Sequence, residues 1–438
     1  MDWLVPLSSI LGGLLFVMAL GMPVAFAFLL VSVVGIVILQ GVGGPLQQLV
    51  LSMISSVASF ALVPIPLFVF MGVVLWYSKL GQQAVDAIDH WVGRLPGRLS
   101  LLTIASGSVF SALSGSTMAN TAMLGTMLLP ELRRRGYARD LSIGPIMAGG
   151  GLAMMIPPSA LAVILASIAK LSVAKILIAA IIPGLIMALL YAIYIVVRSA
   201  LYPEAAPAYE IKGVRWGERF YTLARNLLPL GFIIFSVTGL MVLGVATPTE
   251  AAALGALSSI ALVAFYRRLT WNLLYAALLD SLRISVMTFT IMAAAIGFSQ
   301  ILAYSGATKG LLDAVMSANV APILLIIATQ LIVLVLGCFM EQIAIMLITL
   351  PIFVPIVIGL GYDPIWFAVL MLVNLETALM TPPFGLLLVV MKGVTPETTF
   401  GQIYLAAVPY VACNLIVMAL LIIFPQIVTI LLTMLELK

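Results

Sequence analysis

The chain has 438 residues, of which 63% are hydrophobic and only 8% are charged. Soluble domains carry roughly 25% charged residues, so this composition excludes a water-soluble protein. The net charge of +4 is spread over loops and is not the footprint of a nucleic-acid-binding protein. One histidine and two cysteines cannot build a zinc, haem or disulfide framework.

A helix needs about 20 apolar residues to cross a bilayer, and such stretches recur along the whole chain. The clearest are residues 3–39, 50–78, 177–197, 228–246, 251–265, 284–304, 321–358 and 402–424. No Lys or Arg precedes the first stretch, so we expect it to be a first span and not a cleaved signal peptide. The sequence therefore predicts an all-α polytopic membrane protein.

Four landmarks recur at an interval of 225 residues, which indicates an internal duplication. Pro23 matches Pro248, Pro130 matches Pro355, Gly136-Tyr137 matches Gly361-Tyr362, and Pro157-Pro158 matches Pro382-Pro383. We expect a first repeat at residues 1–197 and a second repeat, with an additional C-terminal helix, at 227–438. The polar linker at 198–226 is expected to be cytoplasmic and to contain an amphipathic helix near 215–225.

The basic residues predict that the two repeats have opposite orientations in the membrane. Residues 90–139 hold six arginines, whereas the matching residues 315–364 hold no Lys or Arg. Basic loops favour the cytoplasmic side, so the matching loops should lie on opposite sides. Inverted-topology repeats are a recurrent feature of secondary transporters.

Each repeat is expected to contain a re-entrant hairpin. Only 34 residues separate Arg98 from Arg133, and both arginines favour the cytoplasmic side. Two full spans would need about 40 residues and a turn, so residues 99–132 should enter the membrane and return. The turn is expected at Ser114-Gly115-Ser116. The matching hairpin, at 324–358, should have "GCFMEQ" (337–342) near its tip.

A Pro-Pro pair interrupts the long apolar segment that follows each hairpin, at 141–169 and at 364–391. Proline removes a backbone donor, so we expect two broken transmembrane helices. Irregular backbone at membrane depth is tolerated where it is buried or lines a cavity. Each hairpin tip should therefore meet a break in the neighbouring helix.

The polar run Ser114–Asn120 would bring hydroxyl, amide and freed carbonyl oxygens together in apolar surroundings. Such oxygens, without a full set of carboxylates, favour a monovalent cation. The alternative is that these small residues serve only close helix packing. Intramembrane carboxyl groups are costly and usually functional, which singles out Glu341 and Glu376. For Glu376 we leave open a structural role and a coupling role.

Five segments resemble the large membrane subunit of tripartite ATP-independent periplasmic (TRAP) transporters. They are "IPLFVFMGVVLWYSKLG" (65–81), "FSALSGSTMANTAMLGTMLLPELRRRGY" (110–137), "MIPPS" (155–159), "GCFMEQIAIMLITLPIFVPI" (337–356) and "NLETALMTPPFGLLLVV" (374–390). The resemblance covers essentially the whole chain. It implies a sodium symporter of the bacterial inner membrane that imports an organic acid, such as sialic acid or a C4-dicarboxylate. It further implies a fold like that of the ion-transporter superfamily, with an elevator movement.

The resemblance also implies partners: a periplasmic substrate-binding protein and a small four-helix membrane subunit. Two or more sodium ions are expected. The first sodium site would comprise Ser114, Gly115, Ser116, Asn120, Ile156 and Pro157. The second would comprise Gly337, Cys338, Met340, Glu341, Thr381 and Pro382. The substrate would bind between them, at Ser116, Thr117, Ser159, Thr381 and Gly385.

The chain departs from the family pattern at three positions. Met118 and Asn120 stand in the first tip where smaller or other residues are expected, and Glu341 stands where Asp is common. One alternative function is a stand-alone sodium–dicarboxylate carrier of related fold, which would need no binding protein. An intramembrane enzyme would need a nucleophile, a base or a metal set in a cavity. A single histidine in a loop argues against an enzyme.

Overall fold

The computed structural model describes residues 3–92, 95–207, 217, 221–317, 320–383 and 385–435. Within these ranges the chain is helical and has no strand. The helices of the first half are α1 (Leu4–Ala19), α2 (Val24–Gln40), α3 (Gly44–Val57), α4 (Pro64–Tyr77), α5 (Leu80–Val92), α6 (Arg98–Ser114), α7 (Thr117–Arg134), α8 (Arg139–Gly151), α9 (Ala160–Ile168) and α10 (Val173–Leu201).

The helices of the second half follow in a similar order. They are α12 (Leu228–Ile234), α13 (Leu240–Val242), α14 (Pro248–Phe265), α15 (Trp271–Tyr304), α16 (Ala307–Ser317), α17 (Pro322–Gly337), α18 (Gln342–Gly359), α19 (Pro364–Leu379), α20 (Leu386–Val394), α21 (Phe400–Ile423) and α22 (Gln426–Met434). Six helical segments of the described ranges are long and apolar enough to cross a membrane. The prediction of an all-α polytopic membrane protein is confirmed.

Several of the long apolar stretches contain more than one helix. Residues 3–39 divide into α1 and α2 because Gly21 adopts a positive φ of 87° and Pro23 precedes α2. Of the expected amphipathic helix near 215–225, the structure describes only residue 217 and residues 221–225. Its described end, Leu223–Leu227, is a π-helical turn that leads into α12.

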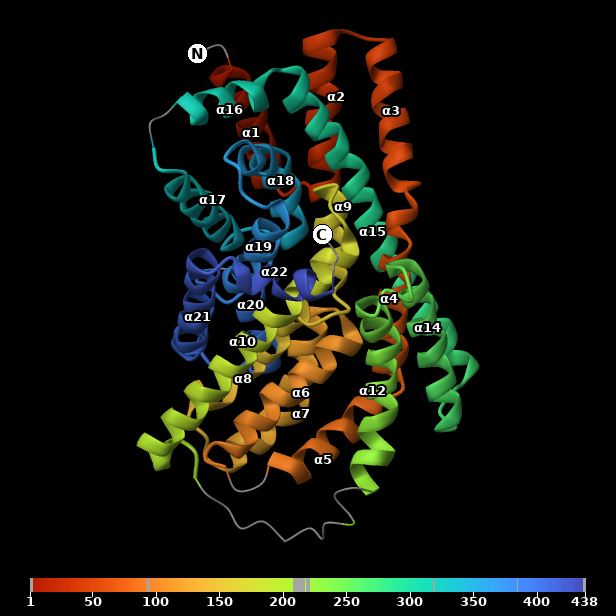
Figure 1. Ribbon diagram of the computed structural model, residues 1–438, viewed down its shortest axis with the longest axis vertical. Helices are drawn as coiled ribbons and strands as arrows, with labels where there is room; N and C mark the ends of the chain where they lie inside the picture. The colour runs from red at the N-terminus through yellow and green to blue at the C-terminus, as the bar shows by residue number, and fades with distance from the viewer. Residues whose placement is uncertain are drawn as a thin grey trace.

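One group of helices, which we call the scaffold group, consists of α2, α3, α4, α14 and α15. The long helix α15 packs along α2, α3 and α4, and α14 packs on α4 (Figure 1). Phe28 of α2 meets Phe298 of α15 edge to face, with ring centroids 5.0 Å apart. Gly297 lets α15 approach closely, because a methyl group there would lie 2.8 Å from Leu49.

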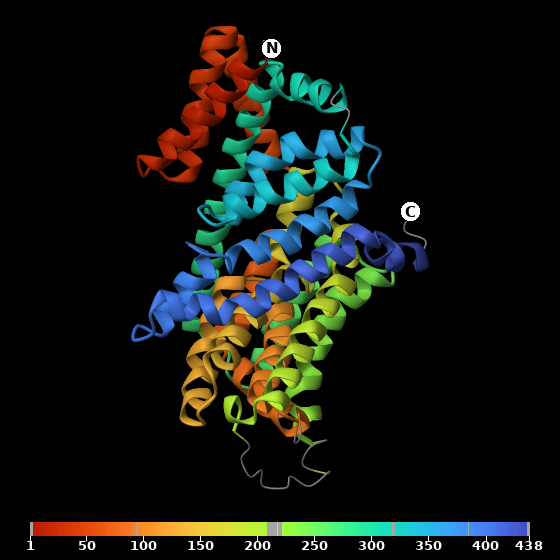
Figure 2. The same ribbon diagram turned by 90° about the vertical axis from the view of Figure 1, so that its left-hand side faces the viewer.

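A second group, the core group, consists of α6 to α10 and α17 to α22. Helix α8 lies at its centre and packs against α6, α7 and α21. Glycines permit this packing: a methyl group at Gly107 would lie 2.7 Å from the backbone of Gly149, and one at Gly144 would lie 2.2 Å from the Tyr410 ring. Figure 2 shows the helices of this group layered across the middle of the molecule.

The 225-residue interval extends from sequence landmarks to helix bounds. Helix α7 begins at Thr117 and ends at Arg134, and α18 begins and ends 225 residues later, at Gln342 and Gly359. Helices α8 and α19 also begin 225 residues apart. The inverted orientation of the two repeats and their boundaries stay predictions.

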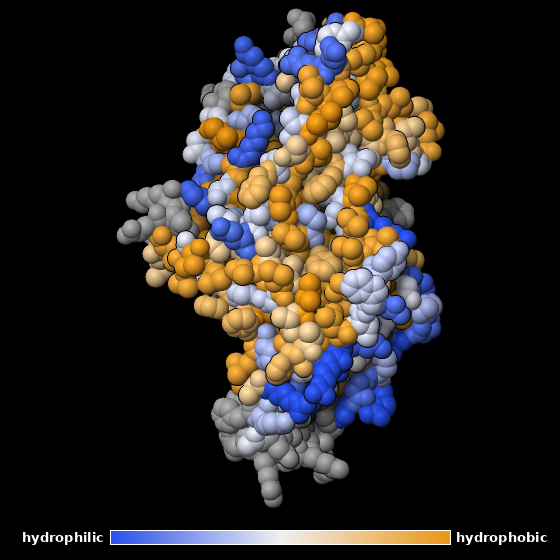
Figure 3. All heavy atoms as spheres, turned by 90° about the vertical axis from the view of Figure 1, so that its right-hand side faces the viewer, coloured by the Kyte–Doolittle hydropathy of each residue, from blue (hydrophilic) through white to orange (hydrophobic). Residues whose placement is uncertain are grey.

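The surface carries many exposed apolar side chains. Figure 3 shows hydrophobic residues over most of the upper and middle part of one face, with hydrophilic residues gathered lower down. Exposed residues on α2 and α15, such as Phe26, Ile38 and Val286, are more than half accessible. This distribution fits a surface that faces lipid, because a soluble protein rarely exposes large contiguous apolar patches.

Candidate functional site

The first hairpin turns at Gly115 and Ser116, between α6 and α7. Gly115 adopts a left-handed conformation with φ of 59°, and the Ser116 hydroxyl caps α7 by accepting a hydrogen bond from the Ala119 N–H at 3.5 Å. The tip lies against the break in the next helix. A methyl group at Gly115 would be 3.2 Å from the Pro158 carbonyl oxygen and 3.5 Å from the Ala160 nitrogen.

Asn120 is fully buried in α7 and joins the hairpin to α8. Its Nδ2 lies within hydrogen-bonding distance of four acceptors: the carbonyl oxygen of Gly107 at 3.2 Å, Ser111 Oγ at 2.9 Å, and the carbonyl oxygens of Gly149 and Gly150 at 3.4 Å. Its Oδ1 has no partner among the described residues. The amide nitrogen therefore has a structural role, and the oxygen remains available to a ligand.

The break in the first half follows a short 3₁₀ turn, η2 (Leu152–Met154). Ile156 closes that turn, and the Pro157-Pro158 bond is cis. The Pro157 carbonyl oxygen accepts a hydrogen bond from Thr238 Oγ1 at 3.2 Å, so a neighbouring helix already uses part of this carbonyl. Ser159, expected at the substrate, caps α9 by accepting from the Ala162 N–H at 3.3 Å.

The second hairpin packs against α19, the helix that precedes the second break. A methyl group at Gly337, the last residue of α17, would be 2.2 Å from Ala378 Cβ in α19. The Cys338 thiol donates to the Leu334 carbonyl oxygen, one turn earlier in the chain. Glu341 is the half-buried N-cap residue of α18.

The residues that follow α19 form the second break. The Thr381 hydroxyl donates to the Thr377 carbonyl oxygen at 2.8 Å, and the Pro382-Pro383 bond is cis. Gly385, the N-cap residue of α20, must be glycine on packing grounds. A methyl group there would lie 2.3 Å from the Leu379 carbonyl oxygen.

The first hairpin tip therefore lies against the first break, and the second hairpin packs on α19 just before the second break. The two sets of ion ligands stay predictions. Thr117, expected at the substrate, is buried just inside α7, and its Oγ1 has no partner among the described residues. Ser114 lies at the edge of a cavity of about 240 Å³, which Lys79 and Trp76 also line. This cavity lies between α4, α5 and the first hairpin.

Sequence reasoning missed two buried pairs that stabilise the surroundings of the sites. Asn374 Nδ2 in α19 donates to the Gln330 side-chain oxygen at 2.9 Å and to the Gln330 backbone oxygen at 2.6 Å. The Tyr191 hydroxyl in α10 donates to Asn414 Oδ1 in α21. The amide side chains of both pairs lie in apolar helices. A polar residue in an apolar helix is a sequence signal that could have identified them.

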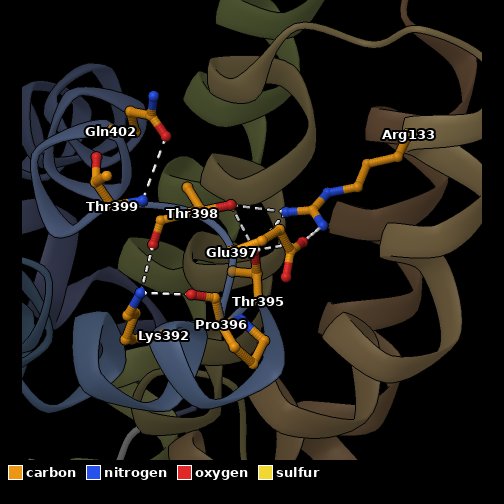
Figure 4. A network of polar contacts seen from close by, with 8 residues as sticks. All are labelled: Arg133, Lys392, Thr395, Pro396, Glu397, Thr398, Thr399 and Gln402. Atoms are coloured by element: carbon orange, nitrogen blue, oxygen red, sulfur yellow. Dashed lines mark hydrogen bonds and ion pairs between the residues drawn. The ribbon is translucent and has the colours of Figure 1, made fainter.

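A polar cluster links the first hairpin to the second half at the far end of α7. Arg133 reaches the loop after α20, where it pairs with Glu397 and donates to Thr395 and Thr398 (Figure 4). Lys392 supports this loop by donating to the Pro396 carbonyl oxygen at 2.6 Å. The cluster fixes the base of the hairpin, remote from the tip.

The sequence of this chain is similar to that of a known protein family. The family described as "Tripartite ATP-independent periplasmic transporter, DctM component" matches residues 11–427. The chain is 30% identical to the C4-dicarboxylate TRAP transporter large permease protein DctM of Pseudomonas aeruginosa, over 87% of this chain and 88% of that protein. It is 28% identical to the ectoine TRAP transporter large permease protein TeaC of Halomonas elongata, over 93% and 94%.

A solved structure matches the fold. The chain is similar to the YdaH transporter of Alcanivorax borkumensis, with a TM-score of 0.65, 14% sequence identity, and coverage of 94% of this chain and 98% of that one. At this identity the likeness concerns the fold alone. The family match spans nearly the whole chain, and the chain therefore belongs to the large permease family of TRAP transporters.

Proposed function

We propose that this chain is the permease of a sodium-coupled importer of an organic acid. The observation that carries the proposal is the pairing of two hairpin tips with two helix breaks, Gly115 against Pro158 and Gly337 against Ala378. Each pairing would bring backbone carbonyls and hydroxyl groups close to a helix break. Oxygen ligands of this kind suit a hard monovalent cation.

The first sodium ion would bind at Ser114, Gly115, Ser116, Asn120, Ile156 and Pro157. Asn120 supports this assignment, because its nitrogen is held by α6 and α8 while its Oδ1 is buried without a partner. A cation would satisfy that oxygen, whose burial alone costs free energy. The second ion would bind at Gly337, Cys338, Met340, Glu341, Thr381 and Pro382, where Glu341 would offset its charge.

The substrate would be a carboxylate held between the two sites, by Ser116, Thr117, Ser159, Thr381 and Gly385. Relatives in this family include permeases for C4-dicarboxylates and for ectoine, so the family alone does not select one compound. The helices α7 and α9 begin near the tip and the break, and helix N-termini favour anions.

We infer that a periplasmic binding protein delivers the substrate and that a small four-helix subunit joins this chain in the bacterial inner membrane. An elevator movement would carry the core group against the scaffold group. The cavity of about 240 Å³ lies along the boundary between α4 and the first hairpin, where Gly72 packs directly on the Ser114 backbone, and the movement would take place at this boundary. A stand-alone carrier would transport without either partner.

The first experiment compares the thermal unfolding of the purified chain in sodium and in potassium at equal ionic strength. A ligand at about 100 times its dissociation constant stabilises by about 2.7 kcal/mol. We expect a rise in melting temperature that is specific for sodium and smaller in Ser116→Ala. Equal melting temperatures in the two salts would contradict sodium binding.

The second experiment reconstitutes the permease in liposomes with a sodium gradient and tests C4-dicarboxylate uptake. Uptake that requires the small subunit and the binding protein supports the tripartite importer. Uptake by this chain alone would instead establish the stand-alone carrier. In both experiments the matched control for Ser116→Ala is Ser317→Ala, at an exposed serine at the end of α16.

A further inference from the structure

Glu376 is a fully buried carboxyl group without a partner. Neither carboxyl oxygen accepts a hydrogen bond from any described residue. The side chain points from α19 onto Gly151, the last residue of α8, where a methyl group would lie 1.3 Å from Oε1. Gly151 precedes the first break, and Glu376 precedes the second, so the carboxyl group lies where the two broken helices meet.

No described basic side chain compensates this carboxyl group. Helices α9, α17, α18 and α22 and the turn η2, all packed against α19, have no titratable residue. In the buried parts of α10 and α21 the titratable side chains are Tyr191, Tyr410 and Cys413. The Tyr191 hydroxyl donates to Asn414 and the Tyr410 hydroxyl donates to the Asp140 carbonyl oxygen at 3.0 Å, so both are already used.

The remaining titratable residues of the neighbouring helices lie toward the helix ends. They are Arg139 and Asp140 of α8, Lys175, Tyr194 and Arg198 of α10, Lys392 of α20, and Tyr404 of α21. Arg198 pairs with Asp140 at 2.9 Å, and Lys392 donates to backbone carbonyls. The turn between α17 and α18 adds Cys338 and the half-buried Glu341. None of these side chains forms a hydrogen bond with the Glu376 carboxyl group in the part of the chain that the structure describes.

An ionised carboxylate without donors or a counter-ion is strongly disfavoured in such surroundings, so the group takes up a proton instead. A positive charge placed nearby would reverse this preference, because it stabilises the carboxylate. Sodium at either break would be such a charge. The first break follows Gly151, which Glu376 contacts, and the second break follows the end of α19, which carries Glu376. By thermodynamic reciprocity, loss of the proton would strengthen sodium binding equally.

We propose that Glu376 is a proton-binding site at the crossing of α8 and α19 whose proton is released when sodium binds at the breaks. This inference rests on the proposed sodium sites and adds a proton to the ions that the permease handles. In the sodium-free protein the carboxyl group is neutral. Sodium binding converts it to the carboxylate, and the proton passes to solvent.

The test uses the purified full chain and needs no substrate. Infrared spectroscopy detects the carbonyl band of a protonated carboxyl group, and a pH indicator in weakly buffered solution detects protons released on adding NaCl, with KCl as the control salt. In parallel, the sodium dissociation constant is measured from melting shifts at acidic and alkaline pH. The variants are Glu376→Gln, Glu376→Asp and, as a matched control, the exposed Glu204→Gln.

We expect a protonated band that Glu376→Gln removes and Glu204→Gln retains, and that NaCl but not KCl diminishes. As much as one proton per chain should be released. Sodium should bind about tenfold more tightly at alkaline pH, and this difference should vanish in Glu376→Gln. If Glu376→Gln does not fold, Glu376→Asp decides, because it keeps a carboxyl band at a shifted frequency.

Two results would overturn the inference. A band that persists in Glu376→Gln would show that the proton is elsewhere, and sodium binding without proton release would show that Glu376 is a permanently neutral structural acid. Failure of the sodium sites themselves is recognised separately, since sodium would then leave the melting temperature of the unaltered chain unchanged while the infrared band still reports on Glu376.

Discussion

Arg133, at the C-terminal end of α7, pairs with Glu397 in the loop between α20 and α21, and this contact holds the base of the first hairpin to the second half of the chain. The same guanidinium group donates to Thr398 Oγ1 at 2.9 Å. Its neighbour Arg134 binds only Glu131, one turn earlier in the same helix, among the contacts that the structure describes. Adjacent arginines therefore differ in what they connect.

Replacing Arg133 should loosen this connection. We expect Arg133→Ala to lower the free energy of unfolding by about 2 kcal/mol, because it removes charge-assisted hydrogen bonds between distant segments. Arg134→Ala should change it by less than about 0.5 kcal/mol, since exposed pairs within one helix contribute little. Chemical unfolding in detergent measures both values. Equal losses would mean that the cluster adds no stability.

The contact between Gly151 and Glu376 should make Gly151→Ala severely destabilising. Forcing a methyl group onto the carboxyl group should cost about 3 kcal/mol, as overpacking in a dense core does. Adding Glu376→Ala should recover most of the lost stability, because it removes the carboxyl group with which the added methyl group overlaps. Gly393→Ala is the control, since nothing lies within 4 Å of a methyl group there. Melting of the four proteins gives the answer, and a double variant no better than Gly151→Ala would contradict the contact.

Alanine variants at Gly115 and Gly136 distinguish an effect of backbone strain from an effect on ion binding. Both have positive φ, 59° and 75°, so alanine should cost about 1 kcal/mol or more at either position. Only Gly115 lies at a hairpin tip, within 3.5 Å of the break once a methyl group is added. We expect Gly115→Ala to weaken the sodium-specific melting shift and Gly136→Ala to leave it unchanged. A weakened shift in both would point to a general loss of structure.

Tyr191 and Asn414 form a buried pair whose loss should be costly. Tyr191→Phe would leave Asn414 without its hydroxyl partner, which should destabilise by about 1–3 kcal/mol. Tyr304→Phe, at an exposed tyrosine, should have almost no effect. Replacing both members, as in Tyr191→Phe with Asn414→Leu, should cost less than Tyr191→Phe alone, because no polar atom is then stranded. A larger loss in the double variant would show that the pair is not the relevant interaction.

The helix bounds agree with sequence signals that are local, whereas the re-entrant course of the hairpins stays a prediction. Arg98 and Arg133 mark the ends of the first hairpin, and the structure begins α6 at Arg98 and ends α7 at Arg134. The helix breaks follow from the Pro-Pro pairs. Proline and charge act on the backbone of their own segment, so their consequences can be read without the fold.

Contacts between distant segments could not be predicted in this way. Asn120 was expected as an ion ligand, yet its nitrogen serves α6 and α8, because the direction of an amide depends on which helices pack around it. The meeting of Glu376 with Gly151 likewise depends on how α8 crosses α19. The pairing of Arg133 with Glu397 joins the end of α7 to the loop after α20, and no local pattern encodes their proximity.

In each half, a side-chain amide forms a hydrogen bond between the hairpin and the broken helix. The amide belongs to the hairpin in the first half and to the broken helix in the second half. In the first half Asn120 belongs to the hairpin and grips the Gly149 carbonyl of the broken helix. In the second half, Asn374 of the broken helix lies 225 residues after Gly149 in the sequence. Its side-chain amide donates a hydrogen bond to the Gln330 side chain of the hairpin. The two halves therefore hold their hairpins with amides from opposite sides of the contact. A substitution designed for this contact in one half cannot be copied to the matching position of the other half, because it would meet a different partner.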